Sequence, residues 1–285
     1  MIQSAFIYHK AASLDDAISM LSQNGDDAKL LAGGHSLLPA MKLRLNRPET
    51  LIDIRRLPEL QGIRMEGGDL VIGAAATHQQ IATSPLVRNH LSMLAEGASQ
   101  IGDPQVRNMG TIGGSLAHAD PAADWSALVL AADATIVVQG AGGKRKIPAA
   151  EFFTGFFETA LAPGEIITEV RIPVAGGNVS AGYFKFAQPA SRFALAGCAV
   201  AFGLENGRIS QARVAFTGVS ENAFRDGAAE AALNGQMPSP EVFEKAAAQA
   251  AENVSVLSDN FASEEYRRHL AKVCARRALS SLAAR

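Results

Sequence analysis

Cysteine is scarce in this sequence: Cys198 and Cys274 are the only two among 285 residues. They form no CxxC pair, and neither stands in a cluster with histidines. Structural zinc sites and iron–sulfur clusters need several such ligands at close spacing. The chain alone is therefore predicted to build neither kind of centre, and Cys198, inside an apolar run, is expected to be a small buried side chain.

The sequence also lacks an excess of charge of one sign, since its formal net charge is −2. A broad basic field that could neutralise nucleic-acid phosphates is therefore absent. Basic residues do gather near the C-terminus, at helical spacing after two glutamates. They predict a solvated helix face or a subunit contact rather than a nucleic-acid site: Arg267, Arg268, Lys272, Arg276 and Arg277.

Long hydrophobic runs are missing as well. No stretch of about 18 apolar residues is present, so no membrane span is predicted. The first six residues lack a basic segment followed by an apolar one, which argues against a signal peptide. We therefore expect a cytoplasmic protein, and an apolar content of 48% predicts a real core.

Hydrophobic periodicity predicts an α/β part followed by an α+β tail. A strand at 29–32 runs directly into Gly33-Gly34, helices are expected at 91–99 and 122–131, and glycines at 175–178 mark a boundary. We predict units at about 1–55, 56–177 and 178–285.

The tail is expected to hold strands at 182–187, 194–205 and 208–217. Asn206-Gly207 between the last two is typical of a type I′ hairpin turn. Helical patterns follow at about 224–233, 240–251 and 262–284. This order predicts a three-stranded antiparallel sheet with three helices on one side.

Two glycine segments carry the chemistry: Ala32-Gly33-Gly34-His35-Ser36 and Thr111-Ile112-Gly113-Gly114-Ser115. Backbone N–H groups hold a phosphate only where the chain comes close and aims several amides the same way, which favours glycine. A helix that begins just after each turn would add its own unpaired amides. Two such turns suit a pyrophosphate approached from two sides, as in a dinucleotide such as FAD.

Neither segment is a GxGxxG or a Walker A sequence, so Rossmann and P-loop folds are disfavoured. A Gly-Gly pair by itself is usually an ordinary turn. Composition and spacing thus indicate two candidate anion-binding turns, without a catalytic triad or a metal cluster.

Longer strings around the two turns resemble one protein family. Residues 32–45 (AGGHSLLPAMKLRL) are similar to the first flavin motif of molybdenum-hydroxylase medium subunits of the carbon monoxide dehydrogenase type. Residues 101–124 (IGDPQVRNMGTIGGSLAHADPAAD) are similar to the second. The family is related to the FAD domain of xanthine dehydrogenase, and its last domain also looks like this tail, so the resemblance covers essentially the whole chain.

The resemblance implies a vanillyl-alcohol-oxidase-type FAD-binding fold of two subdomains within 1–177, then the α+β domain at 178–285. It implies that two sets of residues hold the FAD pyrophosphate and ribose: Leu30, Leu31, Ala32, Gly33, Gly34, His35, Ser36 and Leu37, with Thr111, Ile112, Gly113, Gly114 and Ser115.

Four further positions match residues that the family places near FAD. Ile101 and Ile167 (or its neighbour Ile166) would be apolar contacts, Asp124 would bind the ribitol or ribose region, and Lys185 would lie near the isoalloxazine. In many relatives the strand of Lys185 continues into a segment that contains Asp. Here residues 188–193 read QPASRF, so the resemblance assigns no particular residue after Lys185 to the flavin ring and leaves those contacts open.

Simpler interpretations stand beside these assignments. Asp124 could cap its helix, Lys185 could be a solvated lysine on an edge strand, and Tyr183 could cover the ring or lie in the sheet. Trp125 is expected in helix packing, and His118 in a structural role. Four phenylalanines are expected to form one hydrophobic cluster rather than a substrate site: Phe152, Phe153, Phe156 and Phe157.

The resemblance implies a division of labour. A large partner carries a molybdenum–pterin cofactor and hydroxylates the substrate, a small partner carries two 2Fe–2S clusters, and FAD on this chain passes electrons to an external acceptor. The family forms dimers of such heterotrimers, and no catalytic residue or metal ligand is assigned to this chain. Two alternatives remain: a self-sufficient FAD-dependent reductase, for which no substrate site or proton donor is found, and a flavin-free scaffold, which would have damaged glycine segments.

Overall fold

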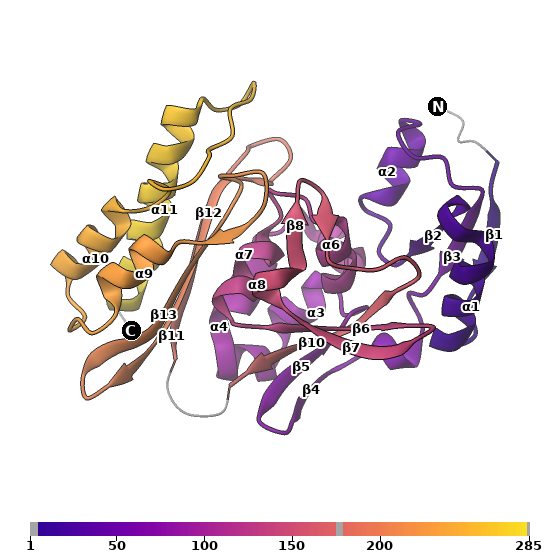
Figure 1. Cartoon of the computed structure of the whole chain (residues 1–285), viewed down its shortest axis with the longest axis horizontal. Coiled ribbons are helices and arrows are strands. Elements are labelled where there is room, and N and C mark those ends of the chain that lie inside the picture. Colours follow the sequence, from indigo (N-terminus) through magenta and orange to yellow (C-terminus); the bar gives the residue numbers. More distant parts are fainter. Residues whose placement is uncertain (1–4, 175–178, 284–285) are drawn as a thin grey trace.

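The computed structural model describes residues 5–174 and 179–283. The boundary predicted at 175–178 lies outside the described residues, as do residues 1–4 of the segment considered for a signal peptide. Three units follow one another across the described part of the molecule, from the indigo N-terminal strands to the yellow C-terminal helices (Figure 1). The mixed α/β character predicted from the sequence is confirmed.

The first unit is a three-stranded parallel sheet in the order β1-β3-β2. Its elements are β1 (Ile7–Lys10), α1 (Leu14–Asn24), η1 (Gly25–Asp27), β2 (Ala28–Leu31), α2 (Leu37–Lys42) and β3 (Thr50–Asp53). Helix α1 begins where the Ser13 hydroxyl accepts a hydrogen bond from the amide of Asp16. Its buried residues, Leu14, Ala17 and Ile18, then pack with Ile52 of the central strand.

The second unit contains an antiparallel sheet in the order β4-β5-β10-β6-β7. The strands are β4 (Ile63–Glu66), β5 (Asp69–Gly73), β6 (Thr135–Gly140), β7 (Gly143–Pro148) and β10 (Ile166–Pro173), and η2 (Pro58–Leu60) precedes them. A small hairpin, β8 (Phe153–Gly155) and β9 (Glu158–Thr159), stands beside this sheet. Strand β10, from late in the unit, lies between β5 and β6, so strands far apart in the sequence are neighbours in this sheet.

Those helices are α3 (His78–Thr83), α4 (Pro85–Ser99), α5 (Pro104–Met109), α6 (Ile112–His118), α7 (Asp124–Ala131) and α8 (Ala149–Phe152). Helix α3 begins with a capping box in which Thr77 and Gln80 satisfy each other's backbone amides. Trp125 of α7 is fully buried in the main core, which confirms the predicted packing role. Helix α4 begins earlier than predicted and is kinked at Leu91.

The C-terminal sheet has the order β11-β12-β13-β14. Its strands are β11 (Ser180–Ala187), β12 (Ala194–Glu205), β13 (Arg208–Thr217) and β14 (Phe224–Arg225). Asn206 and Gly207 both have positive φ, 52° and 77°, as a type I′ turn requires. The two-residue strand β14 is an addition to the three strands that the sequence predicts.

Helices α9 (Gly227–Leu233), α10 (Pro240–Ala248) and α11 (Glu264–Ala283) cover one face of this sheet (Figure 1). Neighbouring residues of a strand face opposite ways. Accordingly, Cys198 and Val200 of β12 join the core under these helices, whereas Ala199 and Ala201 join the core of the second unit. The sheet is therefore buried on both faces, which explains the unbroken apolar run of β12.

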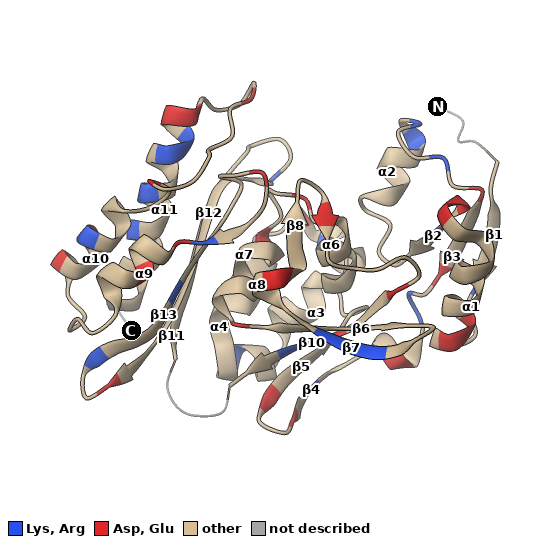
Figure 2. Cartoon of the chain, viewed as in Figure 1, with Lys and Arg blue, Asp and Glu red and all other residues tan. Residues whose placement is uncertain are grey.

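The basic residues of α11 are largely paired. Arg268 bonds Glu264, Arg276 bonds Glu244, and Lys272 bonds Glu252. Figure 2 shows α11 with red at its start, followed by blue along the helix. Arg267 is 3% exposed and donates to the carbonyls of Leu195 and Gly218. The predicted solvated helix face is therefore wrong for Arg267, which is a buried anchor of the C-terminal sheet.

Candidate functional site

The first glycine segment leaves strand β2 and enters helix α2. Gly34 has a φ of +76°, a left-handed conformation that glycine adopts without strain. Within the described part of the chain, the backbone amides of four successive residues donate to no acceptor: Gly33, Gly34, His35 and Ser36. Successive unbonded amides around a left-handed turn form a concavity that suits an anion.

The two glycine segments meet at Gly33. A Cβ atom on Gly33 would lie 2.4 Å from the carbonyl oxygen of Met109 and 2.7 Å from the Cα atom of Gly110. Both neighbours are backbone atoms that cannot move aside cheaply. Glycine is therefore required at this position by the close approach of the chain just before the second segment begins.

Most backbone amides of the second segment are bonded to acceptors within the protein. The amides of Ile112 and Gly113 donate to the carbonyls of Ala76 and Ala74. The Gly114 amide donates to Thr111 Oγ1 at 3.1 Å, as part of the N-cap of α6. The expectation that both segments present several unpaired amides therefore holds for the first and is wrong for the second. The glycine at 113 serves close packing instead, because a Cβ there would lie 2.6 Å from the Cβ of Ala74.

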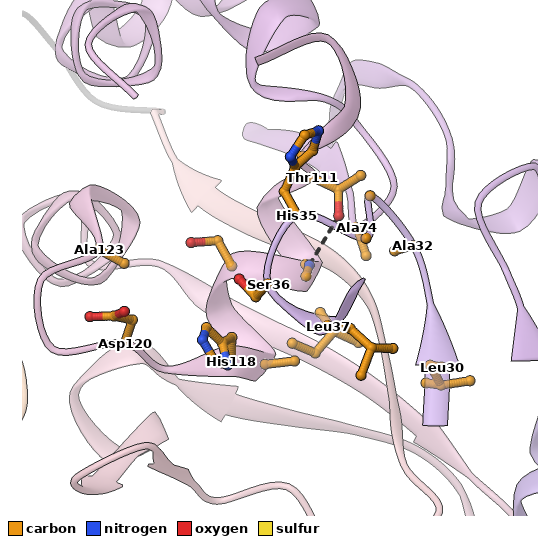
Figure 3. Close-up of a pocket in the computed structure, with 18 of the residues that line it drawn as sticks. Leu30, Ala32, His35, Ser36, Leu37, Ala74, Thr111, His118, Asp120 and Ala123 are labelled. Atoms are coloured by element: carbon orange, nitrogen blue, oxygen red, sulfur yellow. Dashed lines mark hydrogen bonds between the residues drawn. The ribbon is translucent and has the colours of Figure 1, made fainter. Parts of the chain in front are cut away.

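A pocket of about 680 Å³ lies between the two segments, within the range typical of cofactor sites. Figure 3 shows His35 and Ser36 of the first segment and Thr111 of the second among the residues that line this pocket. The structure brings most of the predicted site residues into its wall: Leu30, Leu31, Ala32, Gly33, Gly34, His35, Ser36, Leu37, Ile101, Thr111, Gly113, Gly114, Ser115, Asp124 and Ile167.

Two predicted residues lie outside this wall. Ile112 is fully buried in the main core, and its amide is bonded to Ala76. Lys185 lies behind Asp124, with its Nζ atom 2.8 Å from Asp124 Oδ1. The same ammonium donates to the carbonyls of Gln100 and Arg192, both at 2.9 Å. Lys185 therefore joins α4, α7 and the segment after β11.

The buried Asp124 carboxylate is the centre of this network. The Tyr183 hydroxyl donates to Asp124 Oδ1 at 2.6 Å. Burial raises the pKa of Asp124, and the Lys185 ammonium opposes that shift. Burial and the charge of Asp124 raise the pKa of Tyr183 well above its usual value, so the phenol stays protonated as a donor.

These contacts decide between the interpretations left open above. Ala123, not Asp124, is the N-cap residue of α7, and no side chain caps that helix. Lys185 is buried, so the solvated edge-strand alternative is wrong. Tyr183 is buried in the sheet and does not line the pocket.

Several wall residues escaped the sequence analysis. His78, Leu161 and the segment 191–193 line the pocket, as does Phe157, which has a φ of 56° and packs its ring 5.1 Å from that of His118. The predicted cluster of four phenylalanines is therefore wrong in part. Phe152 and Phe153 are buried, whereas Phe156 and Phe157 are exposed. No local pattern distinguishes these residues, because distant segments bring them to the pocket.

The described part of the chain comprises residues 5–174 and 179–283. No three His, Cys, Asp or Glu side chains in that part are grouped so that they could hold a metal ion. None of its helices combines the length and the hydropathy that a bilayer crossing needs.

Comparisons with known proteins converge on one family. The family described as "FAD binding domain in molybdopterin dehydrogenase" matches residues 3–175, and "CO dehydrogenase flavoprotein C-terminal domain" matches residues 181–282. The chain is 41% identical to the carbon monoxide dehydrogenase medium chain of Hydrogenophaga pseudoflava, over 100% of this chain and 99% of that one. It is 40% identical to the nicotine 6-hydroxylase medium subunit of Paenarthrobacter nicotinovorans, over 99% and 98%.

A solved structure agrees with this match. Carbon monoxide dehydrogenase from Hydrogenophaga pseudoflava, in a form that lacks the Mo-pyranopterin moiety, contains a chain that superposes with a TM-score of 0.95 at 44% identity. The superposition covers 100% of this chain and 99% of that chain. The sequence motifs, the fold and the pocket thus all indicate the same family.

Proposed function

The chain belongs to the family of FAD-binding medium subunits of molybdenum-containing hydroxylases and dehydrogenases, and from this premise we propose that it is the electron-transfer subunit of such an enzyme. It takes electrons from the 2Fe–2S clusters of a small partner and passes them to an external acceptor. A large partner carries the molybdenum–pterin cofactor. Support comes from the relatives, which are named medium chains or medium subunits of oxidoreductases.

The observation that carries the proposal is the amide concavity of Gly33–Ser36 in the wall of a pocket of about 680 Å³. Four unbonded N–H groups match the oxygens of the FAD diphosphate. In the second segment, a Cβ atom on Gly114 would lie 2.9 Å from Thr111 Oγ1 and 4.0 Å from the Cβ of Ala32, so a larger residue there would crowd the wall of the pocket. The residues present therefore fit the cofactor.

The remaining wall divides into apolar and polar parts. Leu30, Ile101 and Ile167 would cover apolar surface of the cofactor and exclude water. Asp124 reaches the wall with a carboxylate held by Lys185 and Tyr183, so it would accept a hydrogen bond from a cofactor hydroxyl in a fixed orientation. FAD, when bound, supplies the redox chemistry, and the chain supplies position and electrostatics.

We extend the proposal to the finer architecture. The first two units, 1–177, would correspond to a vanillyl-alcohol-oxidase-type FAD fold, and 178–285 to the separate C-terminal domain. The enzyme would be a cytoplasmic dimer of heterotrimers, in a compartment where the free thiols of Cys198 and Cys274 stay reduced.

Gentle purification of the tagged chain from its native host tests the function. We expect flavin absorbance together with iron–sulfur absorbance, and two co-purifying chains, one large and one small. Flavin bands on a lone chain that turns over a substrate by itself would favour the self-sufficient reductase. A chain that binds no FAD even when FAD is added would be a scaffold and would overturn the proposal.

A further inference from the structure

His78 occupies a buried position at the start of α3, between α7 and the second glycine segment. Its side chain is 5% exposed, and it lines the pocket. Its backbone amide donates to the carbonyl of Gly110 at 3.0 Å. The backbone of His78 is thereby held against Gly110, which lies just before the second glycine segment.

The tautomer of this imidazole is set by Trp125. The indole Nε1–H donates to His78 Nδ1 at 3.0 Å inside the core. A ring nitrogen accepts only with a free lone pair, so Nδ1 carries no proton and Nε2 does. Burial lowers the pKa of His78 to about 4, and the charges of His35 and Arg107 act in the same direction. The ring is therefore a neutral donor through Nε2–H.

His78 is one of the residues in the wall of the pocket. No residue among 5–174 and 179–283 accepts a hydrogen bond from its Nε2 atom, yet in this part of the chain every buried side-chain nitrogen or oxygen has a partner. Nε2 therefore reaches the accessible surface, and the surface that His78 contributes to is the pocket wall. Nε2–H of His78 is thus a hydrogen-bond donor for which the described part of the chain supplies no acceptor.

Its location favours a particular part of the ligand. A Cβ atom on Gly110 would lie 2.7 Å from Nε2, and the Gly110 Cα is 2.7 Å from the position of a Cβ on Gly33. One glycine therefore lies between the imidazole and Gly33, the first of the four residues with unbonded amides.

We propose that His78 is a binding residue for FAD, donating its Nε2–H to an oxygen of the diphosphate beside the amides of Gly33–Ser36. The inference rests on the proposed function only in that FAD occupies this pocket. Trp125 acts as a positioning residue, because its N–H keeps the proton of His78 on the nitrogen that faces the ligand.

Titration of the flavin-free full chain with FAD tests the proposal. His78→Phe keeps the ring volume and removes the donor, and we expect its Kd for FAD to rise about tenfold or more, as for a hydrogen bond to a charged acceptor. His78→Gln places an amide N–H near Nε2 and should bind within about threefold of the wild type. His90→Gln, on the exposed surface of α4, should change nothing. Unchanged binding by His78→Phe, or equal loss in His78→Gln, would overturn the proposal.

ADP-ribose, which carries the diphosphate without the flavin, locates the acceptor. His78→Phe should weaken ADP-ribose and FAD by similar factors. A loss confined to FAD would place the acceptor on the flavin side and refute the diphosphate assignment.

NMR spectroscopy of the wild type tests the same proposal without depending on whether a variant folds. In ¹⁵N-histidine NMR spectra, Nε2 of His78 should carry the proton, and its N–H signal should shift when FAD binds. A proton on Nδ1 would refute the inference, and so would an Nε2–H signal whose chemical shift does not change when FAD is added. A wild-type chain that binds no FAD at all is a different result, since it removes the proposed function itself.

Discussion

Gly33 is the residue whose size decides whether the two glycine segments can touch. In Gly33→Ala, the new Cβ would lie 2.4 Å from the Met109 carbonyl oxygen, so we expect the segments to separate. The variant should lose bound FAD and about 1–3 kcal/mol of unfolding free energy, as for overpacking. The flavin-to-protein absorbance ratio and urea unfolding measure the two effects.

Gly142→Ala is the matched control, since nothing lies within 4 Å of a Cβ at that exposed turn. It should keep full flavin content and near wild-type stability. Full flavination of Gly33→Ala as well would show that the contact between the segments does not shape the pocket.

The buried imidazole of His78 makes stability depend on pH. Its pKa is about 4 in the folded chain, against about 6.5 when unfolded. Between these values the unfolded chain binds a proton that the folded chain does not, so stability falls as the pH drops from about 6.5 to 4. The free energy of unfolding falls by about 2 kcal/mol by pH 5. Above pH 7 His78 does not change the pH dependence of that free energy.

Urea unfolding at pH 7.5 and pH 5 checks this prediction. The wild type should lose about 2 kcal/mol more than His78→Gln over that interval, because other titrating groups are common to both chains. Equal losses would mean that His78 is not held neutral in the folded state.

At the scale of elements, the pair of Asp124 and Lys185 joins α7 to β11. Lys185→Met would leave a buried carboxylate without its cation, which costs about 3–5 kcal/mol. Adding Asp124→Asn removes the charge, so the double variant should recover much of that loss. A double-mutant cycle on unfolding free energies measures the coupling, and strictly additive effects would contradict it.

Elements with a local signal were predictable from the sequence. Ser13 caps the start of α1, and Asn206-Gly207 joins β12 to β13. Both could be predicted because a capping hydroxyl and a type I′ turn each depend on a few adjacent residues. Strand β14 was not predictable, since two residues have no periodicity and exist as a strand only by pairing with β13. The first half of α4 was missed because the kink at Leu91 interrupts the helical pattern.

The same distinction applies to the pocket. The glycine segments could be found because they are contiguous in sequence. His78 and Phe157 could not, since each reaches the pocket through contacts with distant residues, Trp125 and His118 respectively. The sequence also could not show that most amides of the second segment are hydrogen-bonded while those of the first are not. Two of their acceptors, the carbonyls of Ala74 and Ala76, lie far away in the sequence.

At the scale of the whole molecule, the C-terminal sheet shares a core with the second unit. Ala199 and Ala201 of β12 and Ala215 of β13 belong to the same cluster as Trp125. We therefore expect these two parts to unfold together. Trp125 fluorescence and far-UV circular dichroism should give coincident denaturation curves, whereas two separated transitions would show that the shared core does not couple them.

The pocket wall comes from all three units: Gly33–Ser36 belong to the first, Thr111 and Gly113–Ser115 to the second, and residues 191–193 to the last. A ligand held there is also a clamp between separately built bodies. By mass action, it adds RT ln(1 + [L]/Kd) to the stability of their joined arrangement, about 2.7 kcal/mol at a ligand concentration of one hundred times Kd. We therefore expect bound FAD to favour the joined arrangement, and the melting temperature of the chain to rise with the concentration of FAD.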